Sequence, residues 1–204
     1  MSNALDEALR SAVAGLRPVK RSGTAATAGI RPGSALSVDA TLKLFDAQAT
    51  SRHLDFAARA LQAEGTGFYT IGSAGHESNA AVAAALRPTD PALLHYRSGG
   101  FYCARANQDG PGDAIRDVLR GLVTAATDPI SGGRHKVFGH PRLGVVPMTS
   151  TIASHLPRAV GLGYAIEQAR RVKPRFGSDR GGADERRWPD DAIVVCSFGD
   201  ASVN

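Results

Sequence analysis

The chain has 204 residues, of which 43% are hydrophobic and 21% are charged, and its formal net charge is +5. This composition is ordinary for a globular protein with one sizeable core, and it excludes a strongly charged disordered chain. No apolar run reaches the roughly 20 residues of a membrane-spanning helix, so we expect no membrane partner. The arginines are not interleaved with aromatic residues, so we also expect no nucleic-acid partner.

The N-terminal residues carry no apolar segment of the kind that directs secretion, and a cytoplasmic location is expected. The two cysteines, Cys103 and Cys196, lie inside apolar stretches and are expected to be free thiols. A short helical pattern over 5–13 is followed by a stretch rich in Gly, Pro, Ala and Thr. Because such a composition buries little surface, we predict a flexible arm over 1–34 and one domain over 35–204.

Helices and short apolar strands alternate in the rest of the chain. Ser37 is the predicted N-cap of a long helix that ends near Gly65. The patterns that follow predict helices over 79–86, 114–126 and 155–172, strands over 92–96 and 192–198, a long loop over 128–148 and a solvated connector over 173–191. Such alternation is typical of the α/β class with a mainly parallel sheet flanked by helices.

A candidate metal and phosphate site follows the last predicted strand. In open α/β sheets, ligands bind at the carboxyl ends of the strands, and Gly199-Asp200 stands there. A short carboxylate suits a hard cation such as Mg²⁺, and small residues after it leave backbone N–H groups open to phosphate. The alternative is an aspartate that caps the next helix, which for an isolated Gly-Asp pair is the more common case.

Tyr96-Arg97 is expected at the same edge of the sheet, because it also follows a short apolar run. Arginine suits bidentate hydrogen bonding to phosphate, and tyrosine supplies a hydroxyl donor. A surface arginine beside a half-buried tyrosine is the alternative. Gly161 and Gly163 lie inside a helical pattern, which favours helix packing over dinucleotide binding, and no cysteine or histidine spacing is typical of a zinc site.

Five segments in order resemble one family: GFYTIGSAGHES, LLHYRSGGFYCAR, SGGRHKVFGH, MTSTIASHLPRAVGLGYAIEQAR and VVCSFGDAS. Together they resemble the alpha subunit of the thiamine-diphosphate-dependent dehydrogenase component of 2-oxo acid dehydrogenase complexes, in its branched-chain and acetoin-type members. The resemblance covers about 37–204. It implies the thiamine-diphosphate-binding fold, here truncated at its C-terminal end, with thiamine diphosphate and Mg²⁺ as cofactors.

The resemblance also implies roles for individual residues. Asp200 matches the Mg²⁺ ligand of the family's diphosphate motif, in which it is flanked by Gly199 and by Ala201 at a position where the family has glycine. Tyr96 and Arg97 match the pair that contacts the diphosphate. Ala201 accepts the same backbone as glycine unless its φ is positive, so the turn either tolerates the Cβ or alters the approach of the phosphate.

Four further residues belong to the implied active centre. Ser150 and Ile152 match the segment that meets the aminopyrimidine and wedges the cofactor into its bent shape. His135 or His140 matches a histidine near the reacting centre, and the spacing does not decide between them. The family's next Mg²⁺ ligand would lie beyond Asn204, so the sequence is expected to be an N-terminal fragment of a longer chain that is inactive by itself.

The implied activity is the oxidative decarboxylation of a 2-oxo acid, with a branched-chain substrate favoured over pyruvate, followed by acyl transfer to a lipoyl group. The implied partners are a beta-subunit-like pyrimidine-binding domain, separate or fused, and a lipoyl-bearing acyltransferase, within an oligomer. Two alternatives stay open. One is a transketolase-like carbon transferase, and the other is a non-catalytic homologue that has lost its cofactor, for which Ala201 is the one suggestive residue.

Overall fold

The computed structural model describes residues 4–17, 25–108, 113–176 and 188–202. The chain divides into two compact units, Met1–Thr41 and Leu42–Asn204, and their boundary falls inside the long helix α2 (Val38–Ala63). In the first unit the expected short helix is present as α1 (Ala4–Ala14). The mobility predicted for 1–34 stays a prediction.

The start of α2 confirms the predicted N-cap. The Ala40 N–H donates to Ser37 Oγ at 3.1 Å, and Asp39 places a carboxylate in the first turn, where the helix dipole favours it. The helix ends at Ala63, and Gly65 follows with a φ of 73°, a left-handed conformation that glycine adopts without strain. These local signals therefore fix both ends of the helix.

A small parallel sheet lies at the centre of the second unit. Strand β1 (Ala92–Leu93) pairs with β2 (Val195–Cys196) in parallel, with Ala92 opposite Val195. On the other side of β1, Val145 forms a parallel bridge to Ala92, with Ala92 N to Gly144 O at 2.8 Å and Val146 N to Ala92 O at 2.9 Å. Three extended segments thus run in the same direction with β1 in the middle, which agrees with the α/β prediction.

Both strands are shorter than predicted. The chain turns soon after β1, because the Ser98 N–H donates to the His95 carbonyl at 2.9 Å and helix α4 (Gly99–Gln108) begins one residue later. The sequence analysis did not predict α4, since two consecutive glycines are typical of a turn. In the structure Gly100 allows α4 to pack closely against Glu77, because a Cβ at this position would lie 2.7 Å from the Glu77 carbonyl oxygen.

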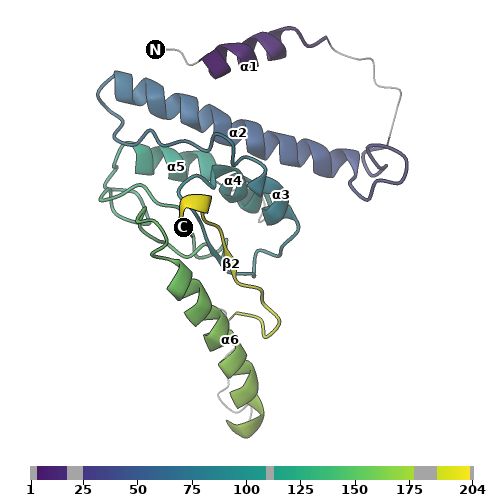
Figure 1. Cartoon of the computed structure of the whole chain (residues 1–204), viewed down its shortest axis with the longest axis vertical. Coiled ribbons are helices and arrows are strands. Elements are labelled where there is room, and N and C mark those ends of the chain that lie inside the picture. The colour runs from purple at the N-terminus through teal and green to yellow at the C-terminus, as the bar shows by residue number, and fades with distance from the viewer. Residues whose placement is uncertain (1–3, 18–24, 109–112, 177–187, 203–204) are drawn as a thin grey trace. The chain divides into compact units, whose positions relative to one another are not determined.

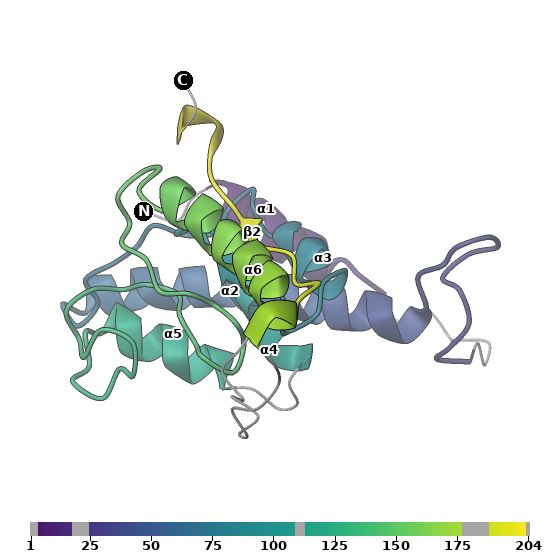
Figure 2. The ribbon, with the colours of Figure 1, turned by 90° about the horizontal axis from the view of Figure 1, so that it is seen from below.

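The remaining helices are α3 (Asn79–Ala84), α5 (Ala114–Leu122), α6 (Leu156–Phe176) and the short 3₁₀ helix η1 (Asp200–Ser202). Figure 1 shows α3, α4 and α5 beside α2, whose Ala47, Leu54 and Ala58 belong to the same core cluster as side chains of α4 and α5. Figure 2 shows α6 beside β2, and these two elements are in contact. Helix α6 extends into the predicted connector, whose residues 177–187 lie outside the described part of the chain. None of the described helices combines the length and the apolar character that a bilayer crossing demands.

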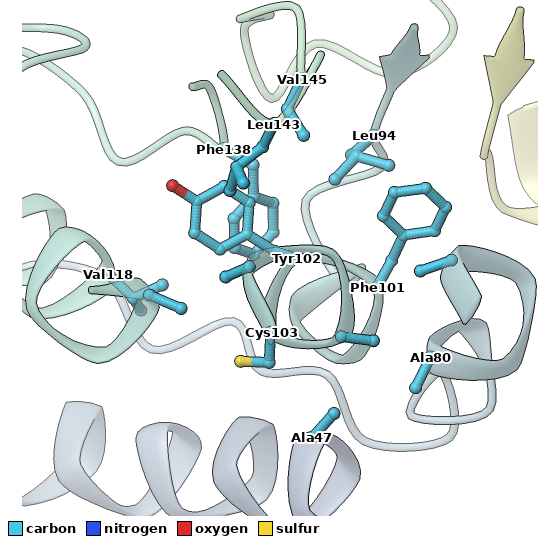
Figure 3. Close-up of a cluster of buried hydrophobic side chains, with 14 of the residues drawn as sticks. Ala47, Ala80, Leu94, Phe101, Tyr102, Cys103, Val118, Phe138, Leu143 and Val145 are labelled. Carbon is cyan, nitrogen blue, oxygen red and sulfur yellow. The ribbon is translucent and has the colours of Figure 1, made fainter. Parts of the chain in front are cut away.

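Helix α4 supplies the centre of the core, as Figure 3 shows. Phe101, Tyr102 and Cys103 are each at most 2% exposed. Around them pack apolar side chains from α2, α5 and the sheet region: Ala47, Val118, Leu94, Phe138, Leu143 and Val145. The core therefore packs the sheet against α4. Cys103 and Cys196 are both free thiols, as predicted.

Candidate functional site

The carboxyl ends of three parallel segments meet at one edge of the sheet. Tyr96-Arg97 follows β1, Gly199-Asp200 follows β2, and Ser150 follows the segment 144–146. Side-chain and backbone bonds tie the first two ends together: the His95 N–H donates to Ser197 Oγ at 2.8 Å, and the Ser197 N–H donates to the Leu93 carbonyl at 3.1 Å. This edge is where open α/β sheets bind ligands.

The turn after β2 exposes the predicted metal ligand. Asp200 and Ala201 are exposed, and they begin η1, which the Ser202 N–H closes by donating to the Gly199 carbonyl at 2.9 Å. Neither has a positive φ, so the backbone at Ala201 accepts a Cβ without strain. Of the two outcomes expected for Ala201, the turn tolerates the side chain.

The residues after β1 form a stack of rings and a guanidinium. The Tyr96 ring lies 3.9 Å from the His95 ring, and the Arg97 guanidinium lies 5.5 Å from the Tyr96 ring centre. Arg97 Nη1 donates to the Gly72 carbonyl at 2.8 Å, which fixes the side chain. Among the described residues no other acceptor takes a side-chain hydrogen bond from Arg97, so its Nε and Nη2 are available to an anion.

His135 and Ser150 form a second pair at this edge. The Ser150 N–H lies 3.2 Å from His135 Nε2, and Ser150 Oγ lies 3.0 Å from the same nitrogen. Ser150 and Tyr96 line one small pocket together with Lys136, and the Tyr69 ring stands edge-on to His135 with centres 6.5 Å apart. The structure therefore brings Ser150 and Tyr96 together from distant parts of the sequence.

Ile152 projects into solvent at the end of this segment, where it is 57% exposed. The next residue, Ala153, has a φ of 62°, a left-handed conformation that costs an alanine about 1 kcal/mol. The structure thus places Ile152 on the surface and not in the core, and its contact with a cofactor stays a prediction.

His140 lies elsewhere. Its N–H and carbonyl pair with those of Val145 at 2.9 and 3.1 Å, and the Val145 segment then bridges to the beginning of β1. His140 thus precedes the parallel segment that Ser150 follows, and its buried Nδ1 has no partner within the described ranges. The structure joins His135, and not His140, to Ser150, and an active-site role for either histidine stays a prediction.

The sequence analysis did not predict that three histidines, His76, His95 and His155, lie near the end of β2. The His95 and His76 rings stack with centres 5.5 Å apart, and His155 Nε2 lies 2.7 Å from the Ser197 carbonyl oxygen. Burial, together with electrostatic repulsion from His76, Arg97 and His155, lowers the pKa of His95 to about 4. His95 is therefore neutral at pH 7. Its position directly before Tyr96 was the one available signal.

A metal site built wholly from this chain is not present in the part that the structure describes, because no three His, Cys, Asp or Glu side chains come together there. Mg²⁺ is commonly held by one or two carboxylates plus the phosphates of its ligand. Asp200 is exposed after β2, and Arg97, which follows the neighbouring strand β1, makes one side-chain hydrogen bond within the described residues, so the two could serve a metal and a phosphate at the same sheet edge. The residues present thus fit a Mg²⁺-diphosphate group.

Comparison with known proteins bears on the same question. No protein-family model matches the chain. It is 27% identical over 132 residues to the 2-oxoisovalerate dehydrogenase subunit alpha 1, mitochondrial, of Arabidopsis thaliana. This match covers 64% of the chain but 27% of the plant subunit, so the chain spans about a quarter of the length of that relative. The similarity supports a distant relationship to dehydrogenase alpha subunits of this kind, without naming a particular member.

Proposed function

We propose that the chain contributes the diphosphate-binding part of a thiamine-diphosphate-dependent 2-oxo acid dehydrogenase. The observation that supports this most strongly is the meeting of Tyr96-Arg97, Ser150 and Asp200 at one edge of the sheet. These residues come from three separate segments. The distant similarity to a 2-oxoisovalerate dehydrogenase alpha subunit favours a branched-chain 2-oxo acid as the substrate.

In this proposal each residue has a binding task. Asp200 holds Mg²⁺, Arg97 and Tyr96 bind the diphosphate, and backbone groups after Gly199 complete the cradle. Ser150 and Ile152 hold the aminopyrimidine end. Thiamine diphosphate, when bound, supplies the electron sink for loss of carbon dioxide from the 2-oxo acid.

His135 is placed to serve the reacting centre in this scheme. Its Nε2 contacts Ser150, and the neighbouring Tyr69 ring limits access of water from one side. A beta-subunit-like domain would complete the site, and a lipoyl-bearing acyltransferase would accept the acyl group. The backbone at Ala201 accepts the Cβ without strain, so this residue gives no reason to prefer a homologue without cofactor.

Calorimetric titration of thiamine diphosphate into the full-length protein, with and without Mg²⁺, tests the proposal. We expect Mg²⁺-dependent binding that Asp200→Asn weakens at least tenfold. Asp191→Asn is the matched control, because it removes the same charge before β2 instead of after it and should leave the affinity unchanged. A folded protein that binds no thiamine diphosphate under any of these conditions would contradict the proposal.

A further inference from the structure

Lys136, the residue after His135, carries a buried amine without a direct ionic partner. It is 7% exposed, and its Nζ lies 3.8 Å from the ring centre of Phe138 and 5.4 Å from that of Tyr69. None of the ion pairs formed within the described residues includes Lys136. Ring faces attract an ammonium group but do not replace a hydrogen-bond acceptor, so this amine requires a further partner.

Lys136 and Asp55 of α2 line the same small pocket. The two side chains line it together with Ser51, Ser73 and Tyr96, among others, and its volume is about 20 Å³. A cavity needs about 10–15 Å³ on this measure to hold one water molecule. The pocket therefore has room for a single water molecule, and its lining includes the charged residues Lys136 and Asp55 and the hydroxyl-bearing residues Ser51 and Ser73.

Asp55 leaves one carboxylate oxygen open. Its Oδ2 accepts the Ser73 N–H at 2.8 Å and the Ser73 hydroxyl at 3.0 Å, and it also faces Arg52 Nη1 at 3.6 Å. In the described part of the chain, no hydrogen-bond donor meets Oδ1. Because the residue is 8% exposed, this oxygen has few routes to bulk solvent.

We propose that one water molecule occupies this pocket and links the Lys136 amine to Asp55 Oδ1, so that a bridged charge pair joins α2 to the segment carrying His135. The geometry that points to it is a buried, unpaired amine and an open carboxylate oxygen on the same water-sized pocket. The charge pair itself does not depend on the proposed function. Its role in holding His135 against Ser150 does rest on that function.

The electrostatics of the pocket agree with such a pair. Burial lowers the pKa of Lys136 to about 8, and the charges of Asp55 and Cys103 act in the opposite direction. Burial raises the pKa of Asp55, whereas hydrogen bonds from Ser73 and the charge of Arg52 lower it, and Glu77 adds a small increase. Burial thus disfavours the charged form of both groups, and the charge of Asp55 favours the charged form of Lys136.

Nuclear magnetic resonance of the full-length protein labelled with ¹³C at the lysine Cε tests the pair. The printed sequence has four lysines, Lys20, Lys43, Lys136 and Lys173, and a Lys136→Met variant assigns the resonance of interest. We expect Lys136 to titrate near 8 and its pKa to fall by about one unit in Asp55→Asn, because the favourable negative charge is lost. Asp46→Asn is the control, since it changes an exposed aspartate on the same helix and should leave this titration in place.

A Lys136 pKa that is unchanged in Asp55→Asn would overturn the proposal, and so would a crystal structure with a dry pocket. If Asp55→Asn does not fold, the pair is tested by changing Lys136 and measuring the pKa of Asp55. In Lys136→Met protein labelled at the aspartate Cγ, the pKa of Asp55 should rise, and an unchanged value would overturn the pair.

Thiamine diphosphate affinity separates this proposal from the proposed function. We expect Lys136→Met to weaken binding several-fold while Lys43→Met, an exposed control on α2, does not. If the unmodified protein binds no thiamine diphosphate, the proposed function fails, and the lysine titration still decides the charge pair. If Lys136→Met binds as tightly as the unmodified protein, the role in positioning His135 is overturned.

Discussion

At the amino end of β1 the protein binds its own charged side chains, whereas at the carboxyl end several of them stay open. Before β1, Asp90 is 2% exposed and accepts hydrogen bonds from Arg87 and from the Ile193 N–H. Arg105 is fully buried, and its Nη1 lies 3.0–3.2 Å from three carbonyl oxygens, those of Pro88, Asp90 and Leu143. Its Nε and Nη2 are buried without a partner among the described residues, so this end differs from the other in burial rather than in complete pairing.

After β1 and β2 the pattern is different. Asp200 is exposed at the start of η1. Arg97 donates from Nη1 to the Gly72 carbonyl oxygen, and its Nε and Nη2 make no side-chain hydrogen bond within the described residues. The comparison teaches that similar residue types serve folding where their partners lie in the same chain. At the opposite end of the same strands, Asp200 is exposed and Arg97 is half-buried, which is the accessibility that the proposed ligand site requires.

The largest difference is expected from Asp90→Asn. It replaces one acceptor oxygen with an NH₂ group that faces the donors of Arg87 or Ile193, so the free energy of unfolding should fall by about 3 kcal/mol. Chemical denaturation at pH 7 measures this loss. Asp191→Asn is the control, because this aspartate also pairs with Arg87 but is 75% exposed, and it should cost about 0.5 kcal/mol or less. Equal losses would contradict the comparison.

The second largest difference is expected between glycine substitutions at the amino and carboxyl ends of the strands, measured as the loss of stability. Gly144 has a φ of 62°, and a Cβ there would lie 2.6 Å from the Pro88 carbonyl oxygen, so Gly144→Ala should cost about 2 kcal/mol. At the carboxyl end, a Cβ on Gly199 would lie 3.6 Å from His95 Nε2, an ordinary contact. We expect Gly199→Ala to change stability by less than about 0.5 kcal/mol. Thermal unfolding of both variants measures the two losses of stability. A larger loss in Gly199→Ala than in Gly144→Ala would contradict the comparison.

Acid should weaken the carboxyl end through His95. The pKa of this residue is about 4 in the folded protein and 6.5 in a free histidine, so the unfolded chain binds the proton first as the pH falls. Its contribution to stability is therefore complete above pH 6.5 and is lost as the pH falls toward 4, by about 1 kcal/mol between pH 7 and pH 5 after allowance for screening. His95→Gln should lose less stability over that interval in urea denaturation. Parallel pH profiles for the two proteins would refute this assignment.

The smallest effect on folding is expected from Asp200→Asn. An exposed carboxylate at the start of η1 contributes little, so the free energy of unfolding should change by less than about 0.5 kcal/mol. Urea denaturation without ligand measures this. A loss above 1 kcal/mol would mean that Asp200 serves the fold as a helix cap, which was the alternative for an isolated Gly-Asp pair.

Much of the fold could be predicted because the deciding signals are local. Ser37 caps α2 through its own hydroxyl, and Gly65 ends the helix through its own φ, so neighbouring residues suffice to predict both. Helix α4 escaped prediction because its first residues, Gly99 and Gly100, are chosen for close packing against Glu77 and Ser51. Packing of that kind depends on residues that are distant in the sequence.

The same distinction applies to the candidate site. The sequence by itself determined which segments carry chemistry: an arginine after one apolar run, an aspartate after another, and a serine in a third segment that resembles a cofactor-binding motif. Roles for these residues stay predictions. Their side-by-side placement required the tertiary structure, because parallel pairing of 144–146, β1 and β2 decides which ends share an edge.

Tertiary structure alone also separated His135 from His140, because the two differ in which end of a parallel segment they reach. It likewise placed Lys136 opposite Asp55, whose separation in the sequence hides any pattern. Local sequence encodes hydrogen bonds between near neighbours. Burial, charge pairing and pocket lining arise only when distant segments pack together, and they decide the properties on which binding depends.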